Sequence, residues 1–152
     1  MNLSKHFLPY LYTSLLATLD IFTKYLIRKN NIQEYVVFED ILTIDLTYNT
    51  GIAFGLLSDY TIFTYILSII VFIWLVFQIR DIKEQNLEKL SLILILSGAV
   101  GNLGERGWNL IIDNDGKVTD FVEFLFIPSF NLADTYISIG IVLLLYSEIK
   151  KD

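Results

Sequence analysis

Five charged side chains stand inside or beside long apolar stretches of this sequence, namely Asp20, Lys24, Arg106, Asp120 and Asp134. A charge at the middle of a membrane-spanning helix costs roughly 2.5 to 3.5 kcal/mol, so such residues usually face the protein interior and have a function. Two carboxylates held close together cannot both ionise, and a pair that shares one proton can catalyse hydrolysis. Asp120 and Asp134 are therefore the candidates for a catalytic pair.

In such a pair, the ionised carboxylate takes a proton from water while that water attacks a peptide carbonyl. The protonated carboxyl group stabilises the oxyanion and later protonates the leaving amine, so the reaction needs no metal. Each position also has a simpler interpretation. Asp134 lies in the first turn of an expected helix, where the helix dipole favours any carboxylate. Asp120 follows a turn and is alternatively a surface loop residue.

Two further pairs have the i, i+4 spacing that places side chains on one helix face. Asp20 and Lys24 can neutralise each other, and the simplest role for them is a structural ion pair near the membrane interface. Asn102 and Arg106 add an amide and a guanidinium group, which could hold a carbonyl or a phosphate. Alternatively, Arg106 extends to the outer lipid headgroups.

Composition excludes several other chemistries. The sequence has no cysteine, which removes disulfides and thiol nucleophiles, and its one histidine, His6, has no second His or Cys with which to share a metal. The net charge of −6 argues against nucleic acid as a partner. The run DNDG at 113–116 resembles the start of a calcium loop, but the rest of that motif is missing.

The chain is 54% hydrophobic and has a mean hydropathy of +0.55, which indicates a bilayer protein. Four stretches approach the about 20 residues that a spanning helix needs. No repeat or linker divides them, so residues 1–152 are expected to form one integral membrane domain. The four expected helices cover about 7–27, 60–79, 90–107 and 131–147.

Four spans would place both termini on the same side of the membrane. Assigning that side to the cytoplasm puts six basic residues inside and four outside, a weak positive-inside bias. The outer segment at about 34–58 is rich in β-branched and aromatic residues and predicts two or three short strands at the membrane surface. The expected fold is thus all-α and membrane-embedded, with a small extracytoplasmic β-rich segment between the first two helices.

Five blocks of the sequence, in this order, carry a resemblance to a known family. They are LDIFTK, YNTGIAFGLL, SGAVGNLGER, VTDF and FNLAD, which together extend over nearly the whole chain. In these blocks the chain resembles the bacterial lipoprotein signal peptidases. Glu105 stands where that family usually has Asp, Ser97 precedes Gly98 where it usually has two glycines, and the 14 positions from Arg106 to Asp120 exceed its usual spacing.

The resemblance implies an aspartic endopeptidase without a cofactor. Such an enzyme removes the signal peptide from a diacylglyceryl-modified prolipoprotein by cutting on the amino side of the lipidated cysteine. It implies Asp120 and Asp134 as the catalytic residues and Asp20 with Lys24 as a structural polar pair. The resemblance also implies substrate-contacting or supporting roles for Asn49, Gly51, Ala53, Phe54, Asn102, Arg106 and Asn131.

The expected partners are the signal peptides of prolipoproteins and membrane lipids, and the protein is expected to act as a monomer. Its expected location is the bacterial cytoplasmic (inner) membrane, with both termini in the cytoplasm and the active site toward the outer face.

Two alternative functions stay open at this stage. One is a relative that binds lipidated peptides without cleaving them, and the other is a small transporter with a polar path. Neither aspartate has the Gly-x-Gly-Asp context of other intramembrane aspartic proteases.

Overall fold

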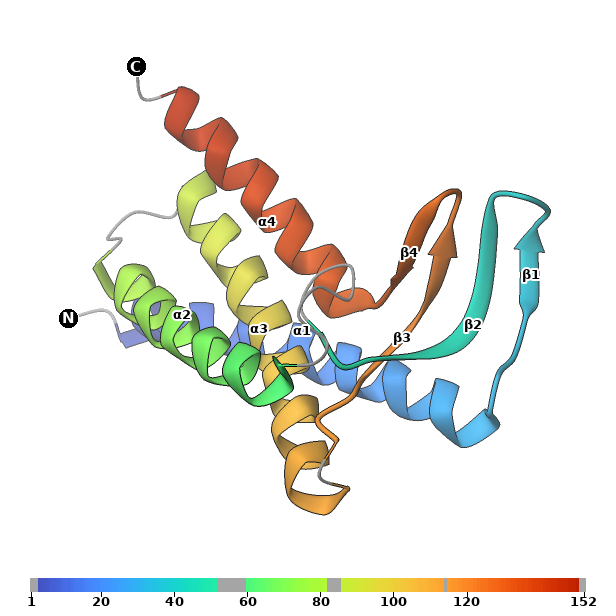
Figure 1. Ribbon diagram of the computed structural model, residues 1–152. Helices are drawn as coiled ribbons and strands as arrows, with labels where there is room; N and C mark the ends of the chain where they lie inside the picture. Colours follow the sequence, from blue (N-terminus) through green and yellow to red (C-terminus); the bar gives the residue numbers. More distant parts are fainter. Residues whose placement is uncertain (1–2, 52–59, 82–85, 114, 151–152) are drawn as a thin grey trace.

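The computed structural model describes residues 3–51, 60–81, 86–113 and 115–150 of the chain (Figure 1). Its helices and strands follow one another in the order α1, β1, β2, α2, α3, β3, β4, α4. The helices are α1 (Leu3–Asn30), α2 (Thr61–Asp81), α3 (Leu87–Ile112) and α4 (Leu132–Ile149). The strands are β1 (Tyr35–Phe38), β2 (Leu42–Asn49), β3 (Val118–Phe124) and β4 (Ile127–Phe130).

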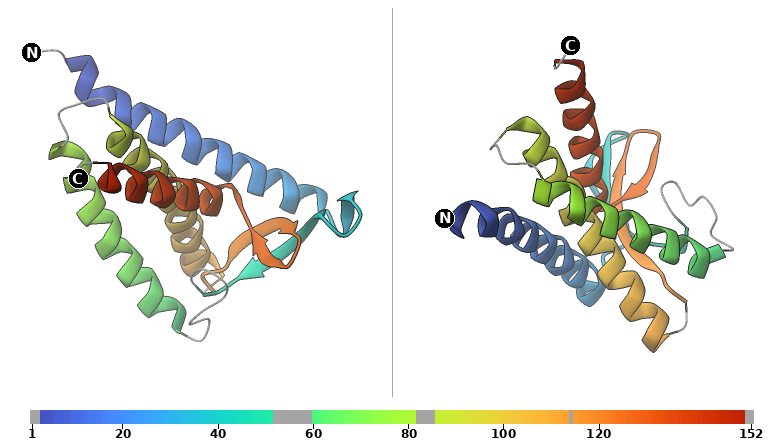
Figure 2. Two further views of the ribbon diagram at one scale, coloured as in Figure 1. Left: turned by 90° about the horizontal axis from the view of Figure 1, so that it is seen from above. Right: turned by 90° about the vertical axis from the view of Figure 1, so that its left-hand side faces the viewer.

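Helix α3 is the central helix and packs against the other three (Figures 1 and 2). The apolar core joins it to α2 through Leu75 and Ile79 on α2 and Leu92, Ile93 and Leu96 on α3. Half of the apolar window of α3 is buried inside the protein, against 17% in α2 and in α4. The other two helices therefore present most of their apolar surface outward, which is the arrangement expected of helices in contact with lipid.

Among the described residues, three helices are long and apolar enough to cross a membrane: α2, α3 and α4. Helix α1 has 28 residues, which is ample length for a span, but it falls outside this group. Polar residues such as Asp20 and Lys24 lower its hydropathy, yet both are almost completely buried, whereas Phe7, Phe22 and other large apolar side chains of α1 are exposed.

Helices α3 and α4 approach each other closely because glycine lies at two of their contacts. A Cβ atom on Gly98 would collide with the backbone oxygen of Ala133, and one on Gly140 would lie 2.8 Å from the backbone oxygen of Ser91. Small residues at helix contacts are common in membrane proteins because they let backbones approach and pack. The contact at Gly98 fixes the start of α4, the turn that carries Asp134.

The four strands form one antiparallel sheet in the order β1-β2-β3-β4, beside the helices (Figure 1). Strands β1 and β2 confirm the predicted strands between the first two helices, and residues 52–59 of that segment lie outside the described part of the chain. Strands β3 and β4 were not predicted. The first four residues of β3 are all buried, so the alternation of apolar and polar residues that identifies a half-exposed strand is absent there.

Much of the long interval between Arg106 and Asp120 is helical. Helix α3 continues to Ile112, five residues beyond its predicted end, and the N–H of Asp113 still bonds to the oxygen of Asn109 at 3.0 Å. Gly116 then adopts a φ of +60°, a conformation that suits glycine in a turn. The lengthened interval therefore extends a helix and leads directly into β3.

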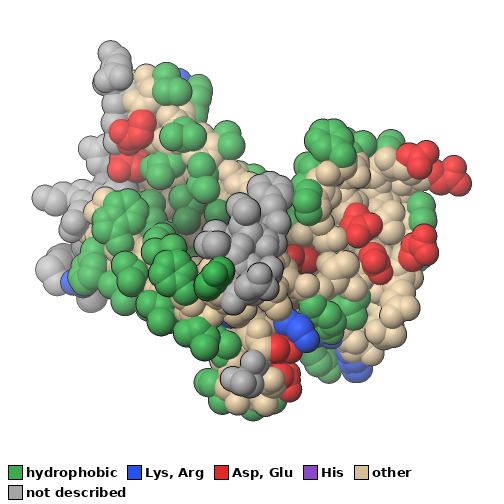
Figure 3. Space-filling model, viewed as in Figure 1, with side chains coloured by type: hydrophobic (Ala, Val, Ile, Leu, Met, Phe, Trp, Pro, Cys, Tyr) green, Lys and Arg blue, Asp and Glu red, His purple; other side chains and the backbone are tan. Residues whose placement is uncertain are grey.

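The surface has two chemically different regions (Figure 3). Hydrophobic side chains cover the helices on the visible face, while acidic side chains gather over the sheet. The turn between β3 and β4 is apolar, and its Phe126 is 92% exposed. The helical part thus suits a hydrocarbon environment, and the acidic part suits water.

Candidate active site

Asp134 is fixed by the local structure of the α4 N-terminus. Asn131 is the N-cap of the helix, and its side-chain oxygen accepts the N–H of Asp134 at 2.9 Å. In return, Asp134 Oδ2 accepts the N–H of Asn131 at 3.2 Å, which completes a capping box. Capping satisfies backbone N–H groups that the first helical turn leaves free. The half-buried Asp134 is therefore held by residues within its own turn.

Asp120 is fixed by strand pairing and by side chains from other segments. It lies on β3 opposite Thr47 of β2 and is only 3% exposed, so it is not a surface loop residue. Its Oδ1 accepts a hydrogen bond from Asn131 Nδ2 at 2.7 Å, and the side chain of Asn49 also bonds to it. Burial, reinforced by the charge of Asp134, raises the pKa of Asp120 to about 7, although both hydrogen bonds oppose this rise.

Asn131 joins the two aspartates. Its side-chain amide donates to Asp120 while its backbone N–H donates to Asp134. Asn102 supports the same arrangement from α3, because its Nδ2 donates to Asp134 Oδ1 at 2.9 Å. The Oδ1 of Asn102 lies 3.3 Å from Asn131 Nδ2. The structure thus brings both predicted catalytic carboxylates into one network of hydrogen bonds.

The polar pair of α1, Asp20 and Lys24, contacts the residues of this network. Asp20 and Lys24 form the expected i, i+4 ion pair at 2.8 Å. The other oxygen of Asp20 accepts the N–H of Ala133 at 2.9 Å, another free N–H of the first turn of α4. Lys24 Nζ donates to Asn102 Oδ1 at 2.7 Å, so that the amide nitrogen of Asn102 points toward Asp134. The pair therefore positions the groups that hold Asp134.

Arg106 holds the chain that follows β2. It is buried rather than extended to the surface, and its guanidinium group donates to the backbone oxygens of Asn49 and Gly51. Gly51 N–H also bonds to Asn49 Oδ1 at 2.8 Å. Arg106 thereby fixes the segment that supplies Asn49 to Asp120. The predicted residues Ala53 and Phe54 lie outside the described residues.

Three residues of this region, Glu105, Arg28 and Thr119, were not among the predicted site residues. Glu105 bonds to Lys24 at 3.3 Å, to Arg28, and to both the hydroxyl and the backbone N–H of Thr119. One signal was present in the sequence, since Arg28 continues the i, i+4 series of Asp20 and Lys24 and thus extends a charged stripe on α1. The partner of that stripe on α3 became visible only in the folded chain.

The carboxylate of Asp134 lies partway along α3, because its partner Asn102 comes well before the end of that helix. Thr61 at the start of α2 and Leu110 near the end of α3 both lie beside Gly116. Asn102 precedes Leu110 by eight residues, which is about 12 Å along a helix axis. The bond from Asn102 to Asp134 therefore places that carboxylate about two helical turns before the end of α3 that lies beside Gly116 and the start of α2.

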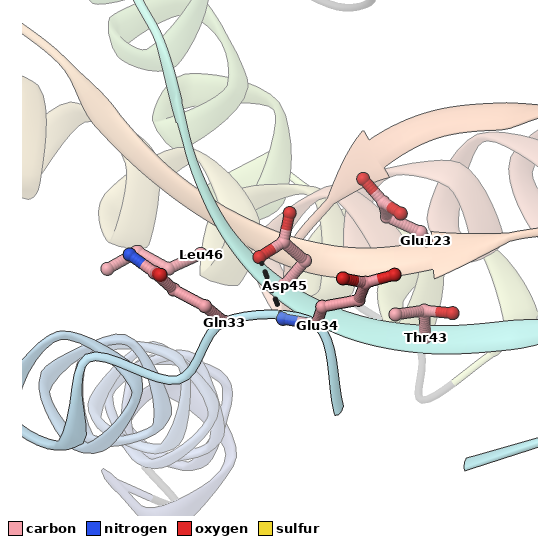
Figure 4. A pocket seen from close by; sticks show the side chains of 6 residues that line it. All are labelled: Gln33, Glu34, Thr43, Asp45, Leu46 and Glu123. Carbon is pink, nitrogen blue, oxygen red and sulfur yellow. Dashed lines mark hydrogen bonds between the residues drawn. The ribbon is translucent and has the colours of Figure 1, made fainter. Parts of the chain in front are cut away.

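A surface pocket lies against strands β2 and β3 (Figure 4), and neither Asp120 nor Asp134 lines it. Glu34, Asp45 and Glu123 contribute carboxylates to it, and the backbone N–H of Glu34 donates to Asp45 Oδ1 at 3.1 Å. Its remaining lining residues are Gln33, Thr43 and Leu46. In the described ranges, no three His, Cys, Asp or Glu side chains are placed to hold a metal ion. The pocket therefore gathers three carboxylates at the surface.

Comparison with known proteins gives one consistent result. A family model described as signal peptidase (SPase) II matches residues 12–150. A lipoprotein signal peptidase of Caldanaerobacter subterraneus subsp. tengcongensis is 37% identical over 136 residues, covering 88% of this chain and 90% of that protein. The lipoprotein signal peptidase of Brevibacillus brevis is 37% identical over 141 residues, covering 90% of this chain and 91% of that protein.

Two solved structures have the same fold. Both are described as bacterial membrane enzymes determined by the in meso method. One superposes with a TM-score of 0.81 at 27% identity and covers 93% of this chain and 87% of its own. The other has a TM-score of 0.80 at 28% identity, with 95% and 94% covered. The likeness therefore includes the sheet as well as the helices.

Proposed function

We propose that this chain, which belongs to the signal peptidase II family, removes signal peptides from prolipoproteins by aspartic peptidase chemistry. Asp120 and Asp134 are the catalytic pair. The substrate carries a diacylglyceryl group on the cysteine that follows the cleaved bond. The observation that carries this proposal is the hydrogen bonding of both carboxylates to the same residue, Asn131.

The surroundings of the two aspartates favour different protonation states. Burial raises the pKa of Asp120 to about 7, so it holds the shared proton more readily. Asp134 accepts hydrogen bonds from Asn131 and Asn102 at the N-terminus of a helix, which suits an ionised carboxylate. Asp134 is then the base that deprotonates water, and Asp120 is the acid that hydrogen-bonds the oxyanion and protonates the leaving amine.

The position of the pair fits a lipidated substrate. Its carboxylates lie about 12 Å inside the outer ends of α2 and α3, by the eight residues from Asn102 to Leu110. A peptide anchored by two acyl chains would hold its scissile bond close to the membrane surface.

The topology that completes this proposal has four spans. Helix α1 is the fourth, because its apolar side chains face outward while Asp20 and Lys24 are buried against α3 and α4. Both termini then lie in the cytoplasm, and the sheet and the aspartates lie at the outer face of the cytoplasmic (inner) membrane. The enzyme acts as a monomer, since both aspartates come from one chain.

Cleavage by purified protein tests the proposal. The substrate is a diacylglyceryl-modified prolipoprotein, and the product is the shortened lipoprotein resolved by gel electrophoresis and mass spectrometry. We expect wild-type protein to cleave it, whereas Asp120→Asn and Asp134→Asn each lower the rate by about 1,000-fold or more, since each removes an acid or base. Cleavage at the wild-type rate by either variant would exclude the pair.

Two controls make this test specific. Asp115→Asn makes the same chemical change in a partly exposed turn, where Asp115 pairs only with Lys117 among its described partners, and we expect an unchanged rate. The same prolipoprotein without its diacylglyceryl group should not be cleaved. Binding of the lipidated substrate without any cleavage by wild-type protein would instead support a non-catalytic relative.

A further inference from the structure

Glu105 is a buried carboxylate on the face of α3 between α1 and β3. It is 8% exposed, and its partners come from both of these neighbouring elements. From α1, Lys24 Nζ lies 3.3 Å from Oε2, and Arg28 pairs with Oε1. Lys24 also pairs with Asp20 at 2.8 Å, so two cations, Lys24 and Arg28, face two buried carboxylates, Asp20 and Glu105.

On its other side, Glu105 binds Thr119 twice. The hydroxyl of Thr119 donates to Oε1 at 2.6 Å, and its backbone N–H donates to Oε2 at 3.2 Å. Two bonds from one residue to one carboxylate fix both the position and the orientation of the strand there. Thr119 is fully buried, and Arg28 donates to its hydroxyl as well, at 3.1 Å.

Thr119 is the residue that precedes Asp120, so the carboxylate of Glu105 holds the backbone that carries the catalytic acid. No described hydrogen bond joins Glu105 to Asp120, Asp134 or Asn131. The same Lys24 ammonium group also donates to Asn102, which holds Asp134. Lys24 therefore contacts both Glu105, which holds the strand of Asp120, and Asn102, which holds Asp134.

We propose that Glu105 is a positioning residue for Asp120, acting through its two hydrogen bonds to Thr119. This inference rests on the proposed function, since it assigns Asp120 the acid role. Displacements of about 1 Å at a reacting group can lower a rate by up to about 100-fold. Loss of the two hydrogen bonds between Thr119 and Glu105 is therefore expected to lower kcat. KM should stay within about threefold, because Glu105 itself does not bind substrate.

Three variants separate positioning from simple stabilisation. Glu105→Gln keeps the shape but removes the charge and one acceptor, so kcat should fall about 10- to 100-fold. Glu105→Asp keeps the charge and both acceptors and should retain more activity than Glu105→Gln by at least about fivefold. Thr119→Val replaces the hydroxyl, to which Arg28 also donates, by a methyl group and keeps the backbone N–H bond to Glu105, so kcat should fall by about tenfold.

The decisive measurement is a double-mutant cycle on kcat, using cleavage of the diacylglyceryl-modified prolipoprotein in detergent. If Glu105 acts through Thr119, the double variant Glu105→Gln with Thr119→Val is no slower than Glu105→Gln alone by more than about threefold. The matched control is Glu123→Gln, which changes an acid to an amide on the same strand as Asp120 and should leave kcat unchanged. Glu123 bonds to Ser129 rather than to any group near the aspartates.

The outcomes are distinguishable. A wild-type protein that fails to cleave the substrate overturns the proposed function, whatever the variants do. Cleavage by wild type with unchanged kcat in Glu105→Gln, or a double variant whose loss equals the product of the single losses, overturns the role of Glu105 alone. If Glu105→Gln does not fold, Thr119→Val decides, and wild-type kcat in that variant overturns the inference.

Discussion

The two aspartates of the candidate site are held in different ways. Asp134 lies in a capping box whose members are three residues apart, Asn131 and Asp134. Asp120 lies on a strand, and the residues that fix its position come from distant parts of the chain, with Asn49, Glu105 and Asn131 acting on it or on its neighbour Thr119. Asp134 is therefore held mainly by the local structure of its own turn, with one bond from Asn102 of α3, whereas Asp120 is held by tertiary contacts.

This difference has a chemical consequence. The groups around Asp134 are hydrogen-bond donors at a helix N-terminus, which favour a negative charge. Asp120 is buried beside another carboxylate, which favours the neutral form. A pair that must divide the roles of base and acid gains from such unequal surroundings, because the shared proton then has a preferred position.

The largest expected effect is on thermal stability. At pH 8, Asn in place of Asp120 should stabilise the protein, whereas Asn in place of Asp134 should destabilise it. The pKa of Asp120 rises from 3.8 to about 7 on folding, so its contribution to stability is fully present below pH 3.8 and is lost as the pH rises through about 7. The loss amounts to at most about 4 kcal/mol. Asp120→Asn should therefore raise the apparent melting temperature in detergent at pH 8 but give little gain at pH 4.

Asp134→Asn should instead lower the melting temperature at pH 8, by an amount equivalent to about 1 kcal/mol. The variant weakens the capping box and removes a favourable charge from the start of α4. Differential scanning fluorimetry of both variants across pH 4 to 8 measures these effects. Shifts of the same sign at pH 8 would contradict the contrast between the two residues.

Asn131→Ser separates the two functions of the residue that both aspartates share. Serine is also a good N-cap, so the support of Asp134 is retained, but the side-chain donor to Asp120 is lost. We expect kcat to fall by about 100-fold with little change in melting temperature. A variant with wild-type kcat would mean that Asp120 keeps its position without Asn131.

Gly98→Ala tests whether close packing fixes the start of α4. The added methyl group would meet the backbone oxygen of Ala133 and the side chain of Ile137, and overpacking of this kind costs about 2 kcal/mol. Gly104→Ala is the matched control on the same helix, because nothing lies within 4 Å of its added Cβ atom. Thermal unfolding should show destabilisation at Gly98 and no loss at Gly104.

Asn102→Ala should have a smaller effect on kcat than Asn131→Ser. It removes one hydrogen bond to Asp134, but the capping box remains. A fall of about tenfold in kcat is expected, corresponding to one hydrogen bond. Steady-state kinetics at saturating substrate compares it directly with Asn131→Ser. A larger loss for Asn102→Ala would show that Asp134 depends on tertiary contacts as much as Asp120 does.

Much of this arrangement could be predicted from sequence where the contacts are short in range. The apolar run at about 60–79 predicts α2, which the structure places at Thr61–Asp81, and the spacing of Asp20 and Lys24 predicts the ion pair that the structure contains. The strands at 35–38 and 42–49 follow from β-branched and aromatic residues. Each of these features depends on residues only a few positions apart.

The sequence predictions were incomplete where a strand is buried on both faces or where contacting residues are distant in the sequence. The strand at 118–124 was missed because its first residues are buried on both faces and show no alternation. The predicted end of α3 at about 107 is too early, because the helix continues to Ile112. Glu105 was noted only as a departure from the family pattern, since its bonds to Thr119 join residues 14 positions apart.

By itself, the sequence determined that this chain is rich in membrane helices and which two aspartates are the candidates for catalysis. It also determined the local geometry of Asp134, because Asn131 and the first turn of α4 need no distant partner to form a cap. Only the tertiary structure decided how Asp120 comes to lie beside Asp134, where both bond to Asn131. That placement depends on β2 pairing with β3, on Glu105 binding Thr119 and on Asn131 reaching Asp120, and such contacts between distant segments exist only once the helices have packed.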